Sequence, residues 1–284
     1  MIQPFTVERV VKNSPASKGD KGIKAGDELI AANGIEVDAK RNRESYFISP
    51  LSKDEIELKF NRSGDEYSIK LKPISSNAFE TLLYDEWMDR NQKIVDEKSD
   101  KRIAYIHMKN MGQGELNRFK KEIANEWHYR DALIFDLRYN RGGNVHDEVI
   151  QILSQRSYLQ WKYRNGELTP QPNFAPSDKP IVLLINEQSL SDAEMTAEGF
   201  KALELGKIIG NETYRWIIFT SGTSLLDGTY FRLPSWGCYT LDGENIEQVG
   251  VAPDIFIINT FKDRLENNDP QLDKAIEEIM NELK

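Results

Sequence analysis

The pattern of hydrophobic and polar positions changes twice along the chain. Up to about residue 72, short apolar stretches alternate with polar turns, which is typical of strands. From 75 to about 99, apolar residues recur at steps of three and four, as one face of a helix requires. Beyond 100, strands that are apolar throughout alternate with amphipathic helices. This alternation predicts a buried parallel sheet with helical crossovers.

The pattern assigns each region its elements. In the first region it predicts strands at 5–11, 28–32, 55–60 and 67–71. In the last region it predicts strands at 102–108, 132–137, 181–186 and 207–210, and helices at 114–126, 145–155 and 192–205. Asp269 and Pro270 are typical of the start of a final helix. We therefore expect a β-rich domain over 1–74, a connecting helix over 75–100 and an α/β core over 101–284.

Composition and charge exclude several kinds of protein. The chain has 284 residues, and 37 Lys and Arg against 46 Asp and Glu give a net charge of −9. This acidic balance, without a long basic run, argues against a nucleic-acid partner. The longest apolar stretches, such as 181–185, are far shorter than the roughly 20 residues of a membrane-spanning helix, so no membrane partner is expected.

The chain has few cysteines and histidines, and their spacing does not indicate a zinc site. No other cofactor is expected. Cys238 is the single cysteine, and His107, His128 and His146 show no ligand spacing with it. The first residues lack the basic start and continuous apolar region of a secretory signal. We expect a cytoplasmic protein, or an exported one whose true start lies upstream.

Two junctions between a predicted strand and the next helix could carry chemistry, because ligands of parallel sheets bind beyond the carboxyl ends of the strands. The first runs from Asp136 to Asn144 and contains Gly142 and Gly143, where backbone N–H groups can approach a ligand closely. An equally good interpretation is a simple turn in which Asn144 caps the helix.

The second junction contains Ser191, followed three residues later by Glu194. This spacing fits a capping box, and a serine in such a position is more often a cap than a nucleophile. A helix start also offers a positive dipole end and free N–H groups, which stabilise an oxyanion. The two interpretations compete for one hydroxyl.

Several motifs, taken together in order, resemble a known enzyme family. The segment SPA…GIKAGDELIAANG resembles the central part of a PDZ domain. The motifs FDLRYNRGGN, SLSDAE, LELGKIIGNET and IEQVGVAPDI resemble the catalytic core of tricorn-type serine proteases, relatives of the tail-specific C-terminal processing peptidases. The resemblance implies a truncated, β-rich PDZ-like domain followed by a ClpP/crotonase-like α/β spiral core.

The resemblance also implies roles for individual residues. Ser191 matches the nucleophile, and the backbone N–H groups of Gly143 and Asp192 match the oxyanion hole. Glu247 matches the acidic residue that orients the catalytic hydrogen bonds, although a solvated surface carboxylate is the simpler interpretation of this residue alone. The implied activity is hydrolysis of peptides or unfolded polypeptides through an acyl-enzyme.

The sequence departs from the family at the general base. Tricorn-like enzymes use a histidine from a segment before the PDZ domain, and no such segment is present here. The tail-specific relatives use a lysine, and Trp216 occupies its position. His107 is expected in the core or at a sheet edge, His146 on the surface of a first helical turn and His128 at a helix end.

The PDZ-like domain also opens late, at the strand over 5–11, without its earlier strand and carboxylate-binding loop. We therefore expect this chain to be the C-terminal piece of a longer protease. The piece should be inactive alone because it lacks the base, and a homo-oligomer is an expectation for the full-length protein. Trp161 falls near the position of the aspartate that gives tricorn its preference for basic P1 residues, and Trp216 adds bulk to the expected cleft. A basic P1 preference is therefore not expected.

Two other functions compete with the peptidase. A catalytically inactive, PDZ-containing module that only binds peptides agrees with Trp216 and the missing base, whereas the intact Ser191, Gly143 and Glu247 argue against it. A crotonase-like enzyme would hold a thioester oxygen with the same paired N–H groups, but the PDZ-like segment points to peptides.

Overall fold

The computed structural model describes residues 5–18, 22–48 and 54–284. The chain divides into two compact units, one ending at Arg90 and the other running from Asn91 to Lys284. The boundary lies inside the long helix α1 (Ser76–Ser99), which closely matches the connecting helix expected over 75–100.

The first unit contains a four-stranded antiparallel sheet in the order β2-β1-β3-β4. Its strands are β1 (Glu28–Ala32), β2 (Ile35–Glu36), β3 (Ile56–Arg62) and β4 (Asp65–Leu71). Short 3-10 turns occupy Pro15–Ser17 and Arg43–Tyr46. A small core forms around the buried side chains of Leu29, Leu58 and Phe60. Asn33 and Gly34 join β1 to β2 with φ of 50° and 77°, the positive values that a tight hairpin turn needs.

The strand predicted over 5–11 is wrong. Thr6 makes only an isolated bridge with Glu28. Val7 instead exchanges backbone hydrogen bonds with a turn, donating to the Asp27 carbonyl and accepting from the Gly26 amide at 2.8 Å each. The apolar residues that suggested a strand are half-buried or buried. The backbone at Phe5 and Thr6 pairs with β1, where the Phe5 carbonyl accepts the Leu29 amide at 2.9 Å, but the backbone at Val7 is paired with a turn.

The second unit contains a five-stranded parallel sheet in the order β13-β10-β9-β6-β5. Its strands are β5 (Ile103–His107), β6 (Ala132–Asp136), β9 (Ile181–Ile185), β10 (Lys207–Gly210) and β13 (Ile255–Phe256). All residues of β5, β6 and β9 are buried, as expected for a sheet covered on both faces. The mixed α/β fold and the parallel sheet predicted from the sequence are therefore present.

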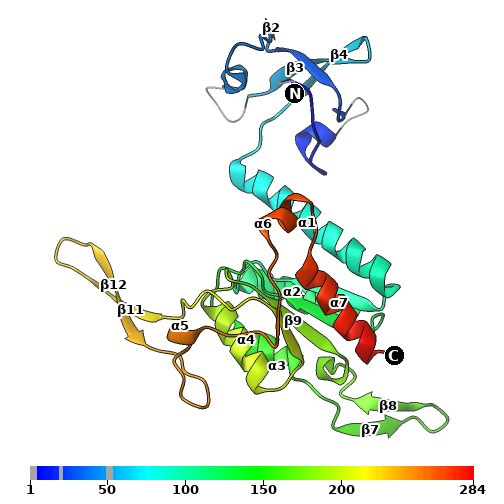
Figure 1. Ribbon diagram of the computed structural model, residues 1–284, viewed down its shortest axis with the longest axis vertical. Coiled ribbons are helices and arrows are strands. Elements are labelled where there is room, and N and C mark those ends of the chain that lie inside the picture. The colour runs from blue at the N-terminus through cyan, green and yellow to red at the C-terminus, as the bar shows by residue number, and fades with distance from the viewer. Residues whose placement is uncertain (1–4, 19–21, 49–53) are drawn as a thin grey trace. The chain divides into compact units, whose positions relative to one another are not determined.

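Helices cover both faces of this sheet. Side chains of α2 (Gln113–Glu126), α3 (His146–Leu153) and α4 (Asp192–Ala202) share one apolar cluster with alternate strand residues such as Ile106 and Phe135. Helix α7 (Pro270–Glu282) contacts β6, β9 and β10. Figure 1 shows α7 and the α3–α4 pair on opposite sides of β9.

The sequence pattern did not predict two hairpins and three short elements. The hairpins pair β7 (Leu159–Lys162) with β8 (Leu168–Gln171) and β11 (Phe219–Ser224) with β12 (Tyr230–Trp236). Both project from the body of the second unit (Figure 1), and their residues are mostly exposed on both faces. The short elements are β13, α5 (Ile246–Val249) and α6 (Phe261–Leu265).

The described residues contain neither a candidate membrane-spanning helix nor a candidate metal-binding cluster. None of their helices has both the length and the apolar content needed to cross a bilayer. Nor do these residues contain a group of three or more His, Cys, Asp or Glu side chains that could hold a metal ion.

Candidate functional site

Two loops meet where the adjacent parallel strands β6 and β9 end. The loop after β6 contains Gly142 and Gly143, and the loop after β9 leads to Ser191. The backbone amide of Leu190 donates to the Asn140 carbonyl at 3.1 Å, and further hydrogen bonds join Ser189 to Leu137 and Tyr139 to Asn186. The two junctions that the sequence singled out therefore form one continuous site.

Ser191 is the residue immediately before α4, and its backbone conformation is unusual. Its φ is 56° and its ψ is −117°. Positive φ in a residue with a Cβ costs of order 1–3 kcal/mol and persists only where the surroundings impose it. The strand–turn–helix setting resembles the sharp turn that presents a nucleophile at the end of a sheet. The residue is half-buried, so its side chain is not sealed in the core.

Glu194 imposes this turn. Its carboxylate is fully buried and accepts the Ser191 amide at 3.0 Å and the Trp216 amide at 2.8 Å through Oε1. Oε2 accepts the Thr213 hydroxyl at 2.6 Å and the Arg215 amide at 2.8 Å. The sequence predicted only a local capping box for Glu194, and its contacts to residues 213–216 could not be foreseen.

The capping box predicted from the sequence forms, with the Ser191 side chain placed to accept the Glu194 amide and the Glu194 carboxylate accepting the Ser191 amide. The Glu194 amide also donates to the main-chain carbonyl of Ser191 at 2.8 Å. The geometry is compatible with both interpretations that the sequence left open for this hydroxyl, a cap and a nucleophile.

The Gly-Gly pair passes directly against the serine turn. A Cβ on Gly142 would lie 2.7 Å from the Ser191 Cβ and 3.3 Å from the Asp192 amide nitrogen, and φ at Gly142 is 72°. A Cβ on Gly143 would lie 2.0 Å from the Met111 carbonyl oxygen. Both positions therefore require glycine, and the simple-turn interpretation does not account for this close approach.

Hydrogen bonds around Gly143 leave its amide unused by the neighbouring segment. Met111 donates to the Gly142 carbonyl and accepts the Asn144 amide, both at 2.8 Å, so its bridge bypasses the Gly143 amide. Asn140, which is buried, supports the loop from below by accepting the Gly142 amide at 2.9 Å and donating to the Met108 carbonyl at 2.6 Å. The role of Asn140 was not predicted.

The carboxylate of Asp192 links the serine turn to the start of α3. It accepts the amides of Val145 at 2.7 Å and His146 at 3.1 Å through Oδ2, and Oδ1 contacts His146 Nδ1 at 2.5 Å. The sequence suggested Asn144 as the cap of this helix, and that is wrong. The helix starts after Val145, which has no side-chain acceptor, so the cap comes from another element.

The other histidines lie away from these contacts. His107 is buried at the end of the edge strand β5, where its ring nitrogen Nε2 is 2.8 Å from the Arg138 carbonyl, and burial lowers its pKa to about 4. This confirms the expected core position at a sheet edge. His128 is exposed just beyond the end of α2. His146 lies in the first turn of α3 as expected, but its side chain is paired rather than simply solvated.

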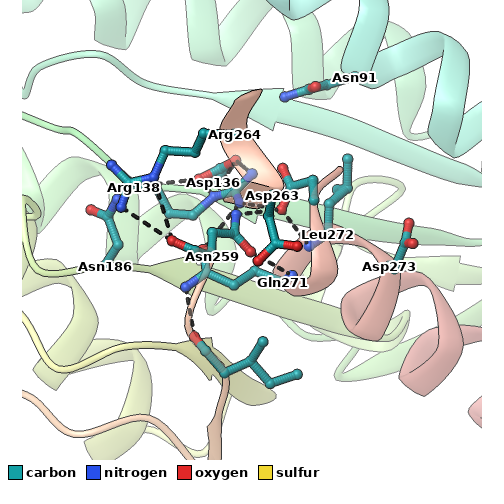
Figure 2. A network of polar contacts seen from close by, with 12 residues as sticks. Asn91, Asp136, Arg138, Asn186, Asn259, Asp263, Arg264, Gln271, Leu272 and Asp273 are labelled. Atoms are coloured by element: carbon teal, nitrogen blue, oxygen red, sulfur yellow. Dashed lines mark hydrogen bonds and ion pairs between the residues drawn. The ribbon is translucent and has the colours of Figure 1, made fainter. Parts of the chain in front are cut away.

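A buried ionic cluster forms around Asp136 and Arg138 (Figure 2). Arg138 donates to both oxygens of Asp136, and its Nη1 reaches Asp269 at 2.7 Å and Gln271 at 3.2 Å. Asp136 and Arg138 are 0% and 1% exposed. Because every charge in the cluster is paired inside the protein, it fastens the end of β6 to the start of α7 and exposes no reactive group.

The remaining candidates differ in how they are connected to the site. The backbone amide of Trp216 donates a hydrogen bond to the Glu194 carboxylate, and the centre of its half-exposed ring lies 5.9 Å from that of Tyr214. Trp161 lies on the β7–β8 hairpin with 56% of its surface exposed. Cys238 is half-buried against the core, and burial raises its pKa.

Glu247 lies in α5 and is half-buried. The segment that follows α5 is tied to the site because the Thr213 hydroxyl, which donates to Glu194, also accepts the Val251 amide at 2.8 Å. Among the described residues, however, no hydrogen bond or ion pair joins the Glu247 carboxylate to Ser191. The structure brings Ser191, Asp192 and Gly143 together but does not add Glu247 to them.

Comparisons with known proteins agree with the resemblance seen in the sequence. Tricorn protease of Thermoplasma acidophilum is 33% identical over 225 residues, which cover 78% of this chain and 21% of the relative. Carboxy-terminal processing protease CtpA of Bacillus subtilis is 26% identical over 86% of this chain and 51% of its own length. A crystal structure of the tricorn protease superposes with a TM-score of 0.81 at 28% identity, covering 99% of this chain and 28% of that one.

The chain thus spans well under two thirds of each of these relatives. The model of Peptidase family S41 matches residues 102–257, more than half of the chain. The predicted kinship with tricorn-type and C-terminal processing peptidases is confirmed, and the chain belongs to peptidase family S41.

Proposed function

We propose that this chain carries the nucleophile and oxyanion hole of a serine peptidase. Ser191 is the nucleophile, and the amides of Gly143 and Asp192 stabilise the oxyanion. The observation that carries the proposal is the strained Ser191 turn, which lies against glycine backbone where no Cβ fits. Two amide donors aimed at a developing oxyanion contribute commonly about 3 kcal/mol each to the transition state.

The proposed reaction has two acyl-transfer steps. The Ser191 oxygen attacks the peptide carbonyl carbon, and its proton passes to a general base while negative charge develops on the carbonyl oxygen. The C–N bond then breaks, the base returns the proton to the leaving amine, and an ester remains on Ser191. Water hydrolyses this ester through the same base and oxyanion donors.

The general base in this proposal comes from outside the described contacts of Ser191. Among the described residues, no histidine or lysine is hydrogen-bonded to the Ser191 hydroxyl. We propose that a part of the full protein beyond these residues supplies the base, and that Glu247 orients the hydrogen-bond network once that part is in place. The link from the segment that follows α5 through Thr213 to Glu194 supports this role, because it couples the backbone near Glu247 to the serine turn.

We further propose that the substrates are peptides or unfolded polypeptides and that the first unit is a truncated PDZ-like domain. Its four-stranded antiparallel sheet and small core are compatible with such a domain. The half-exposed rings of Tyr214 and Trp216, fixed beside Ser191 through Glu194, support an apolar or aromatic substrate preference. A peptide-library profile dominated by Arg and Lys at P1 would contradict this preference.

A serine-directed fluorophosphonate tests the proposal. The Ser191 oxygen displaces fluoride from phosphorus, so a labelled adduct forms only where a serine is activated. We expect the full-length protein to be labelled and the Ser191→Ala variant to remain unlabelled, with Ser224→Ala as the matched control because Ser224 is exposed on the β11–β12 hairpin. Absence of labelling in the full-length protein would leave the alternative, an inactive peptide-binding module, which Trp216 at the lysine position favours.

A further inference from the structure

The Asp192 carboxylate holds together the two loops that carry the proposed oxyanion donors. Asp192 itself provides one donor amide. Its side chain binds Val145 and His146, which follow Gly143 by two and three residues, at 2.5–3.1 Å. A change in this contact would therefore alter the spacing between the Gly143 and Asp192 amides.

The contact is a built feature of the fold rather than a surface ion pair. Asp192 is 2% exposed, and Val145 lacks a side-chain acceptor for the first amides of α3. A carboxylate that accepts these amides satisfies donors at the helix start and interacts favourably with the positive end of the helix dipole. The Asp192 carboxylate, which belongs to α4, thus caps the start of α3 in place of a local side chain.

His146 provides the only side chain that is bonded to this carboxylate among the described residues. Its Nδ1 is 2.5 Å from Asp192 Oδ1, and its side chain is 21% exposed. Asp147, 3.5 Å from Nε2, and Glu148 are the other charged groups that face the ring. The hydrogen bond to Asp192, assisted by these negative charges, raises the pKa of His146.

We propose that His146 is a positioning residue that clamps the Asp192 carboxylate against the start of α3 and thereby fixes the geometry of the oxyanion hole. This inference rests on the proposed function. It assigns His146 no proton transfer to or from substrate, because among the described residues the ring contacts Asp192 and Asp147 and makes no hydrogen bond to the Ser191 hydroxyl.

Three variants of the full-length protein test the clamp. His146→Ala removes the donor to Asp192. His146→Asn keeps an N–H at nearly the same place but cannot take part in proton transfer. His128→Ala removes an exposed histidine outside the site and serves as the matched control. The readout is the second-order rate of fluorophosphonate labelling at Ser191, because the phosphonyl oxygen of the adduct occupies the oxyanion hole.

We expect labelling of His146→Ala to be slowed roughly tenfold or more, because misplacing an oxyanion donor costs part of the 10²–10³-fold effect of removing one. Labelling of His146→Asn should stay within about threefold of the wild type, as should that of His128→Ala. For peptide hydrolysis, the same order should appear in kcat, with KM nearly unchanged. Equal rates for His146→Ala and the wild type would overturn the inference, and so would an equal loss in His146→Ala and His146→Asn.

Histidine NMR of the wild type keeps the test decisive if His146→Ala does not fold. A His146 pKa at or below about 6.5, the value of an unperturbed histidine, would overturn the clamp. If the wild type is not labelled at all, the proposed function fails, and the role of His146 fails with it. If the wild type is labelled and the His146 variants behave alike, only the clamp fails.

Discussion

The second unit contains two groups of buried carboxylates, and their difference separates architecture from candidate chemistry. In the cluster around Asp136 and Arg138, the buried carboxylate and guanidinium are matched to each other and to neighbouring residues, and nothing reactive remains exposed. Around Ser191, the carboxylates of Asp192 and Glu194 are also fully engaged, but they hold a strained turn whose serine is half-buried rather than sealed in the core. Buried charge alone indicates structure, whereas a partly exposed nucleophilic group on a strained backbone indicates function.

The largest effect is expected from breaking the first group. Arg138→Ala would leave Asp136 without its buried partner, which typically costs about 3–5 kcal/mol in the free energy of unfolding. Arg141→Ala is the matched control, because Arg141 is exposed three residues away and should change stability by less than about 0.5 kcal/mol. Urea denaturation measures both. Similar midpoints for the two variants would show that the cluster is not structural.

A somewhat smaller effect is expected from Glu194→Gln. The substitution replaces one acceptor oxygen with a donor that must face an N–H or O–H group, so the hydrogen bonds at that oxygen are lost. We expect a loss of about 2–3 kcal/mol in unfolding free energy and a labelling rate at Ser191 reduced at least tenfold. Glu198→Gln makes the same change one turn along α4. If both variants are labelled at the wild-type rate, Glu194 does not hold the serine turn.

Gly142→Ala sharpens the comparison because it disturbs the turn without touching a charge. The new Cβ would meet the Ser191 Cβ at 2.7 Å, and φ of 72° disfavours alanine. We expect about 1–2 kcal/mol of destabilisation together with reduced labelling. Gly114→Ala, where a Cβ would meet nothing within 4 Å, is the control for thermal melts and labelling. Wild-type labelling in Gly142→Ala would show that the two loops do not need their close approach.

The smallest effect concerns pH. The pKa of His146 is raised in the folded state by Asp192, so the added stability is fully present below the unfolded pKa of about 6.5 and is lost as pH rises through the higher folded value. His146→Asn keeps the hydrogen bond without the charge. We expect the wild type to exceed this variant by at most about 1 kcal/mol at low pH, with the gap closing above pH 6.5. A gap that widens with rising pH would contradict the assigned pairing.

Much of this architecture could be predicted from the sequence because it follows from local patterns. Strands β6 and β9 are uninterrupted apolar runs, and Asp269 followed by Pro270 marks the start of α7, where the Asp269 side chain accepts the Leu272 amide. The loops that contain Gly142 and Ser191 were found because they follow these two strands. The strand over 5–11 failed because an apolar segment can pack on a core while its backbone pairs with a turn.

The interactions that shape the site could not be predicted in the same way. Glu194 contacts Arg215 and Trp216, and Asp192 contacts Val145 and His146, across more than 20 and more than 45 residues of sequence. No local periodicity encodes such pairs. At the start of α3 the sequence offered Asn144 as a local cap, so nothing in it indicated that the cap would come from Asp192.

The central claim is that the amides of Gly143 and Asp192 converge on the oxygen of a group attached to Ser191. A crystal structure of the fluorophosphonate adduct of the full-length protein measures this directly. We predict that the phosphonyl oxygen lies within about 2.7–3.1 Å of both amide nitrogens. An adduct at Ser191 whose oxygen points to solvent, with neither amide within hydrogen-bonding distance, would contradict the account.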